Sequence, residues 1–328
     1  MILLLGANGL LGHNLLALLL KQGQRVRCIV RNPSRLDPGV TSMAATGQLD
    51  IVTGSVLNRA FLMKNLWGCD TAINCAGVTD MALGSVEDYK DVNTSLPLML
   101  ARLMDETGGH TLIDVSTANT VDPGTKDSPA NESTPFGGPF SGSFYARSKR
   151  ESETALLEFA GSHPRLRTVI ILPGFMIGPY DRKPSSGTLL MTGYRKPIMA
   201  VPPGGKSFID VRDVAAAIVG ALSNPLAQGR YLTTGKSLTL KEFFNIQASV
   251  CNYSQHCFTL SRKVCLAVGT LGDRLESMGK KVLFVSRNVR QLMVEEWYDN
   301  TRARTELNMP QTPIEQSIKD FFEYNGRK

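Results

Sequence analysis

The sequence has 328 residues, of which 42% are apolar and 20% charged, and its 36 basic and 29 acidic residues give a net charge of +7. With a mean hydropathy of −0.07, these values exclude an intrinsically disordered chain, a collagen-like repeat and a bundle of membrane helices. No apolar run approaches the roughly 20 residues of a spanning helix, and the first residues lack a signal-peptide pattern, so we expect a cytoplasmic protein.

Short apolar runs alternate with segments of helical periodicity in the first half of the chain. The runs predict β-strands at residues 1–5, 25–30, 50–52, 71–74, 111–115 and 167–172. Apolar residues spaced three and four apart predict helices at residues 10–21, 60–66, 89–106 and 144–160. Because strands that alternate with helices form βαβ units, we expect an α/β fold with a Rossmann-type, doubly wound parallel sheet covered on both faces.

The pattern changes in the second half of the chain. Residues 122–143 are rich in Pro, Gly, Ser and Thr and predict a loop, either a flap or a mobile segment. Residues 179–206 carry few periodic runs, and residues 208–222 then resemble a strand followed by a helix. Further helices are predicted at residues 240–251 and 314–324.

This change of pattern predicts two parts. Residues 1–178 are expected to form a dinucleotide-binding core that carries the catalytic residues. Residues 179–328 are expected to form a smaller, partly interleaved part that mainly binds substrate, with residues 207–235 returning to the core.

A glycine-rich turn follows the first predicted strand and begins the first predicted helix. Its sequence is Gly6-Ala-Asn-Gly-Leu-Leu-Gly12, a spacing that differs by one residue from the usual dinucleotide fingerprint. Glycines there allow a tight turn, close approach of the pyrophosphate and close packing of helix on strand, while the helix N-terminus attracts phosphate. The residues predicted to contact a dinucleotide here are Gly6, Asn8, Gly9, Leu10, Leu11 and Gly12.

The end of the second predicted strand bears on the choice of dinucleotide. An NAD enzyme usually places an acidic residue there to bind the ribose 2′-hydroxyl, whereas this chain has Arg31 and no acid nearby. A guanidinium group suits a 2′-phosphate, so NADP(H) is the preferred cofactor and NAD(H) the alternative, with Arg35 as a weaker second contact.

Tyr145 and Lys149 are four residues apart and therefore share one face of a predicted helix. A free phenol has a pKa near 10, and an ammonium group one turn away would stabilise its phenolate. The strand at residues 111–115 ends at Ser116 and Thr117, where a hydroxyl could polarise the substrate oxygen that Tyr145 protonates. These four residues are the predicted catalytic group.

Taken together, these features resemble the extended short-chain dehydrogenase/reductase superfamily, which includes the NAD-dependent epimerase/dehydratase family. Further motifs at matching places are Asn74-Cys-Ala-Gly77, Asp91-Val-Asn93-Thr, the segment from Leu172 to Pro179, the segment from Phe208 to Asp213 and the segment from Tyr298 to Leu307. The resemblance implies that Thr117 is the catalytic hydroxyl. It also implies cofactor contacts from Cys75, Ala76, Gly77, Asn93, Pro173, Gly174, Phe175 and Met176.

One position departs from the pattern of that superfamily. Ser55 stands where relatives usually carry an Asp that contacts adenine, which leaves backbone contacts from Ser55 and Val56. The sequence is most similar to the dihydroflavonol-4-reductase and 3β-hydroxysteroid-dehydrogenase-like group, as the segment 178–184 and the apolar pair Phe175-Met176 indicate.

Three functions stay open at this point. The first is an NADP(H)-dependent oxidoreductase that interconverts a ketone and a secondary alcohol, with a lipophilic or aromatic substrate suggested by the apolar residues. The second is an NDP-sugar epimerase or dehydratase, against which Arg31 and Phe175 count. The third is a non-catalytic NADP-binding sensor, although such proteins typically lose the Tyr or the Lys. A homodimer is left open.

The remaining features of the sequence concern metal ions and macromolecular partners. Six Cys and four His are dispersed without a zinc spacing, so no metal is expected. Scattered basic residues argue against a nucleic-acid partner, but residues 261–290 are basic and carry an apolar stripe. We interpret the stripe as a lid over the substrate cleft or as core, with a membrane-surface or partner helix as the alternative.

Overall fold

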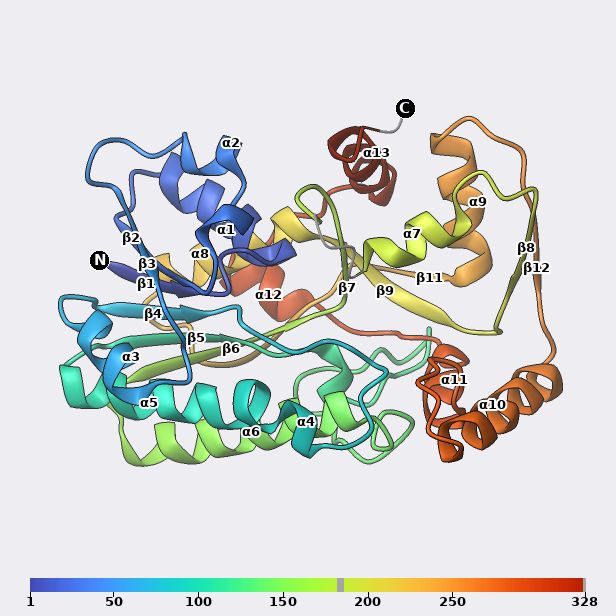
Figure 1. The fold of residues 1–328 in the computed structure, drawn as a ribbon, viewed down its shortest axis with the longest axis horizontal. Coiled ribbons are helices and arrows are strands. Elements are labelled where there is room, and N and C mark those ends of the chain that lie inside the picture. Colours follow the sequence, from blue (N-terminus) through green and yellow to red (C-terminus); the bar gives the residue numbers. More distant parts are fainter. Residues whose placement is uncertain (182–185, 327–328) are drawn as a thin grey trace.

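The computed structural model describes residues 1–181 and 186–326. Seven parallel strands form the main sheet (Figure 1), in the order β10-β6-β5-β4-β1-β2-β3. The strands are β1 (Ile2–Leu5), β2 (Val26–Val30), β3 (Leu49–Thr53), β4 (Thr71–Asn74), β5 (Thr111–Val115), β6 (Arg167–Pro173) and β10 (Gly229–Thr233). The predicted doubly wound parallel sheet is therefore confirmed.

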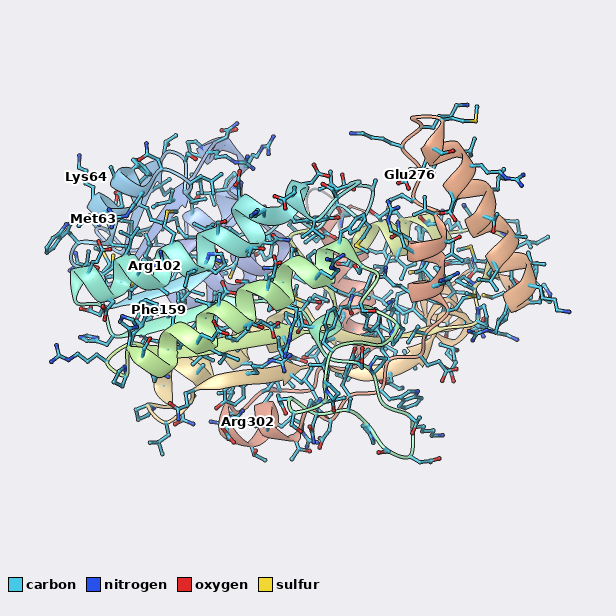
Figure 2. All side chains as sticks on the ribbon, turned by 90° about the horizontal axis from the view of Figure 1, so that it is seen from below. Met63, Lys64, Arg102, Phe159, Glu276 and Arg302 are labelled. Carbon is cyan, nitrogen blue, oxygen red and sulfur yellow. The ribbon has the colours of Figure 1, made fainter. Side chains whose placement is uncertain are left out.

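The sheet is covered by helices on both faces because its central strands are apolar on both sides. Along β1, Ile2 and Leu4 point to one face and Leu3 and Leu5 to the other, and all four side chains are buried. One face packs against α1 (Leu10–Lys21), α8 (Val211–Ser223) and α12 (Thr301–Glu306). The other packs against α3 (Arg59–Leu66), α5 (Leu96–Thr107) and α6 (Phe144–Ser162). Figure 2 shows α5 and α6 side by side over that second face.

The helix predicted at residues 89–106 is interrupted in the structure. It consists of α4 (Glu87–Tyr89), the π-helical segment η2 (Lys90–Ser95) and α5. Pro97 at the start of α5 lacks the N–H group that would bond to the carbonyl of Asn93, so the regular α-helical ladder cannot continue across this point. The wide turn that results contains Asn93.

The second half builds a smaller apolar core beside the main sheet. Its elements are β7 (Phe175–Ile177), α7 (Gly187–Gly193), β8 (Ile198–Val201), β9 (Gly205–Asp210), β11 (Lys236–Thr239), α9 (Leu240–Val250), β12 (His256–Thr259) and α13 (Ile314–Tyr324). Strands β11, β9 and β7 form one small sheet, and β12 pairs with β8. The rings of Phe208 and Phe243 stack at 4.2 Å in this core. Sequence periodicity did not predict α7 and β8.

The segment from residue 207 to residue 235 connects the two cores. It contributes β9 to the small sheet, then α8 against α1, and finally β10 at the edge of the main sheet beside β6. Residues 122–143 contain no helix or strand, as predicted. They are attached to the C-terminal segment, since Ala130 and Trp297 are joined by a backbone hydrogen bond of 3.0 Å.

The remaining elements are short or lie at the margin of the molecule. They are η1 (Pro33–Arg35), α2 (Pro38–Thr41), η3 (Ala118–Thr120), α10 (Arg262–Ser277) and α11 (Ser286–Leu292). None of the helices in 1–181 and 186–326 is long and apolar enough to cross a membrane. Of the sequence segment 178–184, residues 182–184 lie outside the described residues.

Candidate active site

The predicted site residues gather at one edge of the main sheet. The glycine turn follows β1, Arg31 follows β2, Ser55 lies just beyond β3, Cys75 follows β4, and Ser116 follows β5. Gly174 follows β6 in the same way. Since the strands are parallel, all these segments leave the sheet at its carboxyl edge, which is where open α/β sheets bind ligands.

The glycine turn is shaped by three different requirements. Gly6 has φ +75°, and a Cβ on it would lie 2.5 Å from the carbonyl carbon of Cys75. A Cβ on Gly12 would overlap the carbonyl oxygen of Gly6, so α1 packs closely on the turn. Around Gly9 the nearest atom is 3.4 Å from the Cβ position, so this glycine is not required by contacts within the protein.

The start of α1 is open to an anion. Gly9 precedes the helix and caps it with no side chain, and no acidic residue lies in the first turn. The first N–H groups of a helix and its positive dipole end favour a phosphate group at such a place. The residues present therefore fit the pyrophosphate of a dinucleotide.

Arg31 lies directly after β2 and is exposed. Across the part of the chain that the structure describes, its guanidinium has no hydrogen-bond or ion-pair partner. Beyond the neighbouring strand, Ser55 is exposed and its hydroxyl accepts a 3.3 Å bond from the backbone N–H of Leu57, while Val56 is half-buried. The Ser55 hydroxyl is therefore occupied locally.

Thr117 and Tyr145 meet between the end of β5 and the start of α6. Burial raises the pKa of Tyr145 to about 12, and a hydrogen bond with the Thr117 side chain opposes that shift. The ring of Tyr89 lies 6.2 Å from that of Tyr145, and its hydroxyl donates to the carbonyl of Asp80. With such a pKa the Tyr145 phenol stays protonated at neutral pH and can donate a proton.

Lys149 is one turn further along α6 and is buried. Its Nζ donates a 2.8 Å hydrogen bond to the carbonyl of Val115, the last residue of β5. Burial lowers the pKa of Lys149, and the nearby Asp114 carboxyl opposes this shift. A Cβ on Gly77 would lie 3.7 Å from Nζ, so the glycine leaves room in front of the ammonium group.

Ser116 belongs to a buried polar network with Glu153 and Arg230 that the sequence analysis did not predict. Its hydroxyl donates a short hydrogen bond to Glu153 Oε1, and Arg230 Nε lies 2.9 Å from Glu153 Oε2. Burial raises the pKa of Glu153, and Arg230 is the main group that opposes the shift. Glu153 is four residues after Lys149 and eight after Tyr145, so their shared helix face was the signal that could have found it.

Asn93 holds the turn that follows β4. Its side-chain oxygen accepts from the N–H of Val78 at 2.8 Å, and its Nδ2 donates to the carbonyl of Val78 at 2.9 Å. Nδ2 also lies 3.2 Å from the hydroxyl of Ser148, the residue before Lys149. The Asn74 side-chain oxygen accepts from the N–H of Ala76 and its Nδ2 donates to Asp114, so two Asn side chains fix residues 75–78 beside α6.

Residues 173–176 lie where β6 passes into β7. A Cβ on Gly174 would overlap the carbonyl oxygen of Ser207, so the chain crosses there in close contact. Phe175 is half-buried and lies edge-on to Phe208 at 5.5 Å, while Met176 packs against the core of the main sheet. The side chain at position 175 thus belongs to the smaller apolar core.

Comparison with known proteins agrees with this geometry. A sequence model of the NAD dependent epimerase/dehydratase family matches residues 2–233, which is more than half of the chain. The chain belongs to this family. It is accordingly an enzyme of the extended short-chain dehydrogenase/reductase type, dependent on a nicotinamide dinucleotide.

Two relatives match nearly the whole chain. Sterol demethylase protein B of Methylococcus capsulatus is 25% identical over 326 residues, which cover 97% of this chain and 96% of the relative. A putative dihydroflavonol 4-reductase of Synechocystis is 25% identical over 332 residues, covering 98% and 94%.

Solved structures share the fold. The crystal structure of gox2253 superposes with a TM-score of 0.82 at 21% identity and covers 100% of this chain and 99% of its own. MoeE5, solved in complex with UDP-glucuronic acid and NAD, has a TM-score of 0.77 at 17% identity and covers 99% and 98%. At these identities the likeness extends to the fold alone.

Proposed function

We propose that this protein is an NADP(H)-dependent oxidoreductase that interconverts a ketone and a secondary alcohol. The observation that carries the proposal is the meeting of Thr117, Tyr145 and Lys149 at the carboxyl edge of the sheet, beside a glycine turn suited to a pyrophosphate. When bound, the dinucleotide supplies or accepts a hydride at the carbonyl carbon.

The residues of the chain would handle the proton and the oxygen. Tyr145 donates its proton to the carbonyl oxygen as the alcohol forms, and Thr117 hydrogen-bonds the same oxygen. The Lys149 ammonium, held by the carbonyl of Val115, stabilises the phenolate that remains. Because burial raises the pKa of Tyr145, its phenol is protonated at neutral pH and available for this donor role.

The cofactor preference rests on Arg31. Its guanidinium, which has no partner among residues 1–181 and 186–326, follows β2, where a 2′-phosphate can be bound by two parallel N–H···O bonds. Gly6, Gly9 and Gly12 would hold the pyrophosphate, and Lys149 and Asn93 would lie toward the nicotinamide end. NAD(H) is the alternative cofactor.

The substrate we propose is a lipophilic carbonyl compound or alcohol. The name of one relative refers to a sterol and that of another to a dihydroflavonol, and both are largely apolar rings that carry oxygen. Phe175 and the aromatic core behind it would offer an apolar wall to such a ring. In this proposal residues 179–328 mainly bind substrate, and residues 1–178 carry the cofactor and catalytic groups.

An NDP-sugar epimerase or dehydratase is the second candidate, favoured by the fold shared with the UDP-glucuronic acid complex of MoeE5. It would use the same Tyr and Lys but keep its cofactor tightly bound. The absence of an acid after β2 and the apolar Phe175 speak for the first candidate.

The test is NADPH oxidation by the full chain with a panel of lipophilic ketones. Tyr145→Phe removes the proton donor and should lower kcat by about 10²- to 10⁴-fold, while the dissociation constant for NADPH stays within about twofold. Tyr89→Phe is the matched control, because its ring lies beside Tyr145 but its hydroxyl bonds to Asp80. Turnover of an NDP-sugar with no ketone reduction would refute the proposal, as would full activity of Tyr145→Phe.

Cofactor choice is tested separately. Arg31→Ala should raise KM for NADPH by about 10- to 100-fold and leave KM for NADH nearly unchanged, since only NADPH has the 2′-phosphate. Arg25→Ala is the control, because Arg25 is exposed just before the opposite end of β2. An equal change for both cofactors contradicts the role of Arg31.

A further inference from the structure

The helix α10 exposes its apolar side chains instead of burying them. Val264, Val268, Leu271 and Met278 are exposed, with 54% of Leu271 and 71% of Met278 accessible. With Leu275 they recur every three or four residues, so they form one continuous stripe along the helix. The interpretation of this stripe as core is therefore wrong.

The apolar side chains are exposed because the opposite face of α10, which packs against α11, consists of small residues. The buried residues of α10 are the small ones, Cys265, Gly269 and Gly272. A Cβ on Gly272 would overlap the carbonyl oxygen of Phe284, and one on Gly269 would lie 3.0 Å from Ser286. The small residues let α10 lie close against α11 and the preceding turn, and they leave the large apolar side chains outside.

The apolar surface continues into the turn between the two helices. Leu283 is 61% accessible and Phe284 is also exposed. We call Val264, Val268, Leu271, Leu275, Met278, Leu283 and Phe284 the hairpin surface. Figure 2 shows α10, marked by Glu276, at the margin of the molecule away from the main sheet.

The hairpin is also basic. Residues 262–292 contain seven Lys and Arg and two acidic residues, a net charge of +5 out of +7 for the whole protein. Both acids are engaged within the hairpin, Asp273 with Ser286 and Glu276 with Arg287. The exposed basic residues around the stripe are Arg262, Lys263, Arg274, Lys280, Lys281 and Arg290.

An apolar stripe flanked by Lys and Arg fits an anionic lipid surface. The aliphatic side chains can enter the acyl region, while long basic side chains reach the lipid phosphates. A second copy fits poorly because two hairpins would bring +5 against +5. A nucleic acid fits poorly because the stripe is aliphatic and offers few rings for base stacking.

The hairpin is fixed to the catalytic half by its other side. Asn288 donates a 3.1 Å hydrogen bond to the carbonyl of Met81, and Arg287 lies 5.1 Å over the ring of Phe144, the neighbour of Tyr145. A surface bound through the outer face of α10 would therefore be connected through α11 to the start of α6.

We propose that the hairpin surface binds the face of an anionic lipid bilayer, with α10 lying in the plane of the headgroups. This binding goes beyond the proposed function and does not depend on it, since no catalytic residue takes part.

The test is co-sedimentation of the full chain with vesicles of phosphatidylcholine alone or of an equimolar mixture with phosphatidylglycerol. We expect binding to the mixed vesicles, weakened by salt, and little to the neutral ones. Leu271→Asp should lower the partition coefficient at least about tenfold. Leu226→Asp is the matched control, because Leu226 is 84% accessible and lies far along the chain from the hairpin, beside β10.

A second pair of variants keeps the test independent of folding. Lys280→Glu combined with Lys281→Glu should lower binding at least about tenfold, whereas Lys21→Glu with Lys319→Glu should change it little. All four lysines are exposed, so the midpoint temperature of thermal unfolding should stay near the wild-type value in both double variants. Absence of binding, equal binding to neutral vesicles, equal loss in the control variants, or a dimer that Leu271→Asp dissociates would each overturn the proposal.

Discussion

The buried pair of Glu153 and Arg230 should strongly stabilise the edge of the main sheet at which β5 ends. Glu153 is fully buried. One of its carboxylate oxygens accepts a hydrogen bond from the Ser116 hydroxyl, and the other lies 2.9 Å from Arg230 Nε. Arg230 is 9% accessible and also donates to the carbonyl of Glu132 at 2.7 Å. Glu153→Ala would leave a buried guanidinium without its counter-charge, which costs about 3–5 kcal/mol of unfolding free energy.

Urea denaturation followed by circular dichroism measures this cost. With a slope of about 3 kcal/mol per M, the midpoint of Glu153→Ala should fall by about 1–1.7 M. Glu151→Ala, an exposed change two residues away, should leave it unchanged. The double variant Glu153→Met with Arg230→Met should recover most of the loss, because no charge is then left unpaired. The reasoning is refuted if Glu153→Ala loses less than about 1 kcal/mol of unfolding free energy. It is also refuted if the double variant loses as much unfolding free energy as Glu153→Met and Arg230→Met lose together as single variants.

Two further outcomes follow from the site. Gly12→Ala should lower the unfolding free energy by about 1–3 kcal/mol and weaken NADPH binding, measured by fluorescence, because its Cβ would overlap the Gly6 carbonyl. Gly9→Ala should weaken binding while keeping stability, and equal stability of both variants would contradict the steric argument. Because burial raises the pKa of Tyr145 to about 12, the cofactor-free protein and its Tyr145→Phe variant should show the same phenolate absorbance below pH 10. Extra ionisation in the wild type near pH 8 would show that the phenol is not held protonated.

Six strands of the main sheet and the glycine turn could be predicted because their signals are local, whereas the seventh strand, β10, was not predicted. A strand buried on both faces must be a short apolar run, and β1 with its following turn satisfies this within twelve residues. The predicted positions of Thr117, Tyr145 and Lys149 also come together, since each follows from a strand end or from spacing on one helix.

The parts that could not be predicted depend on long-range packing. Glu153 and Arg230 are 77 positions apart and belong to residue types that are usually exposed, so only the fold shows that they pair. The α10 stripe has the same periodicity whether it faces a core or solvent, and the small residues that decide between the two make their contacts with α11.

The place of β10 has a consequence for how the chain folds during synthesis. Its pairing with β6 joins Leu232 to Leu172 across 60 residues, and the family match ends at residue 233, the last residue of β10. Until that strand emerges from the ribosome, one edge of β6 has no hydrogen-bonding strand beside it. The apolar residues Val169 and Ile171 lie in this unpaired strand. The first 178 residues thus carry the proposed cofactor and proton groups but leave an open strand edge, and a chain stopped there would be prone to aggregation.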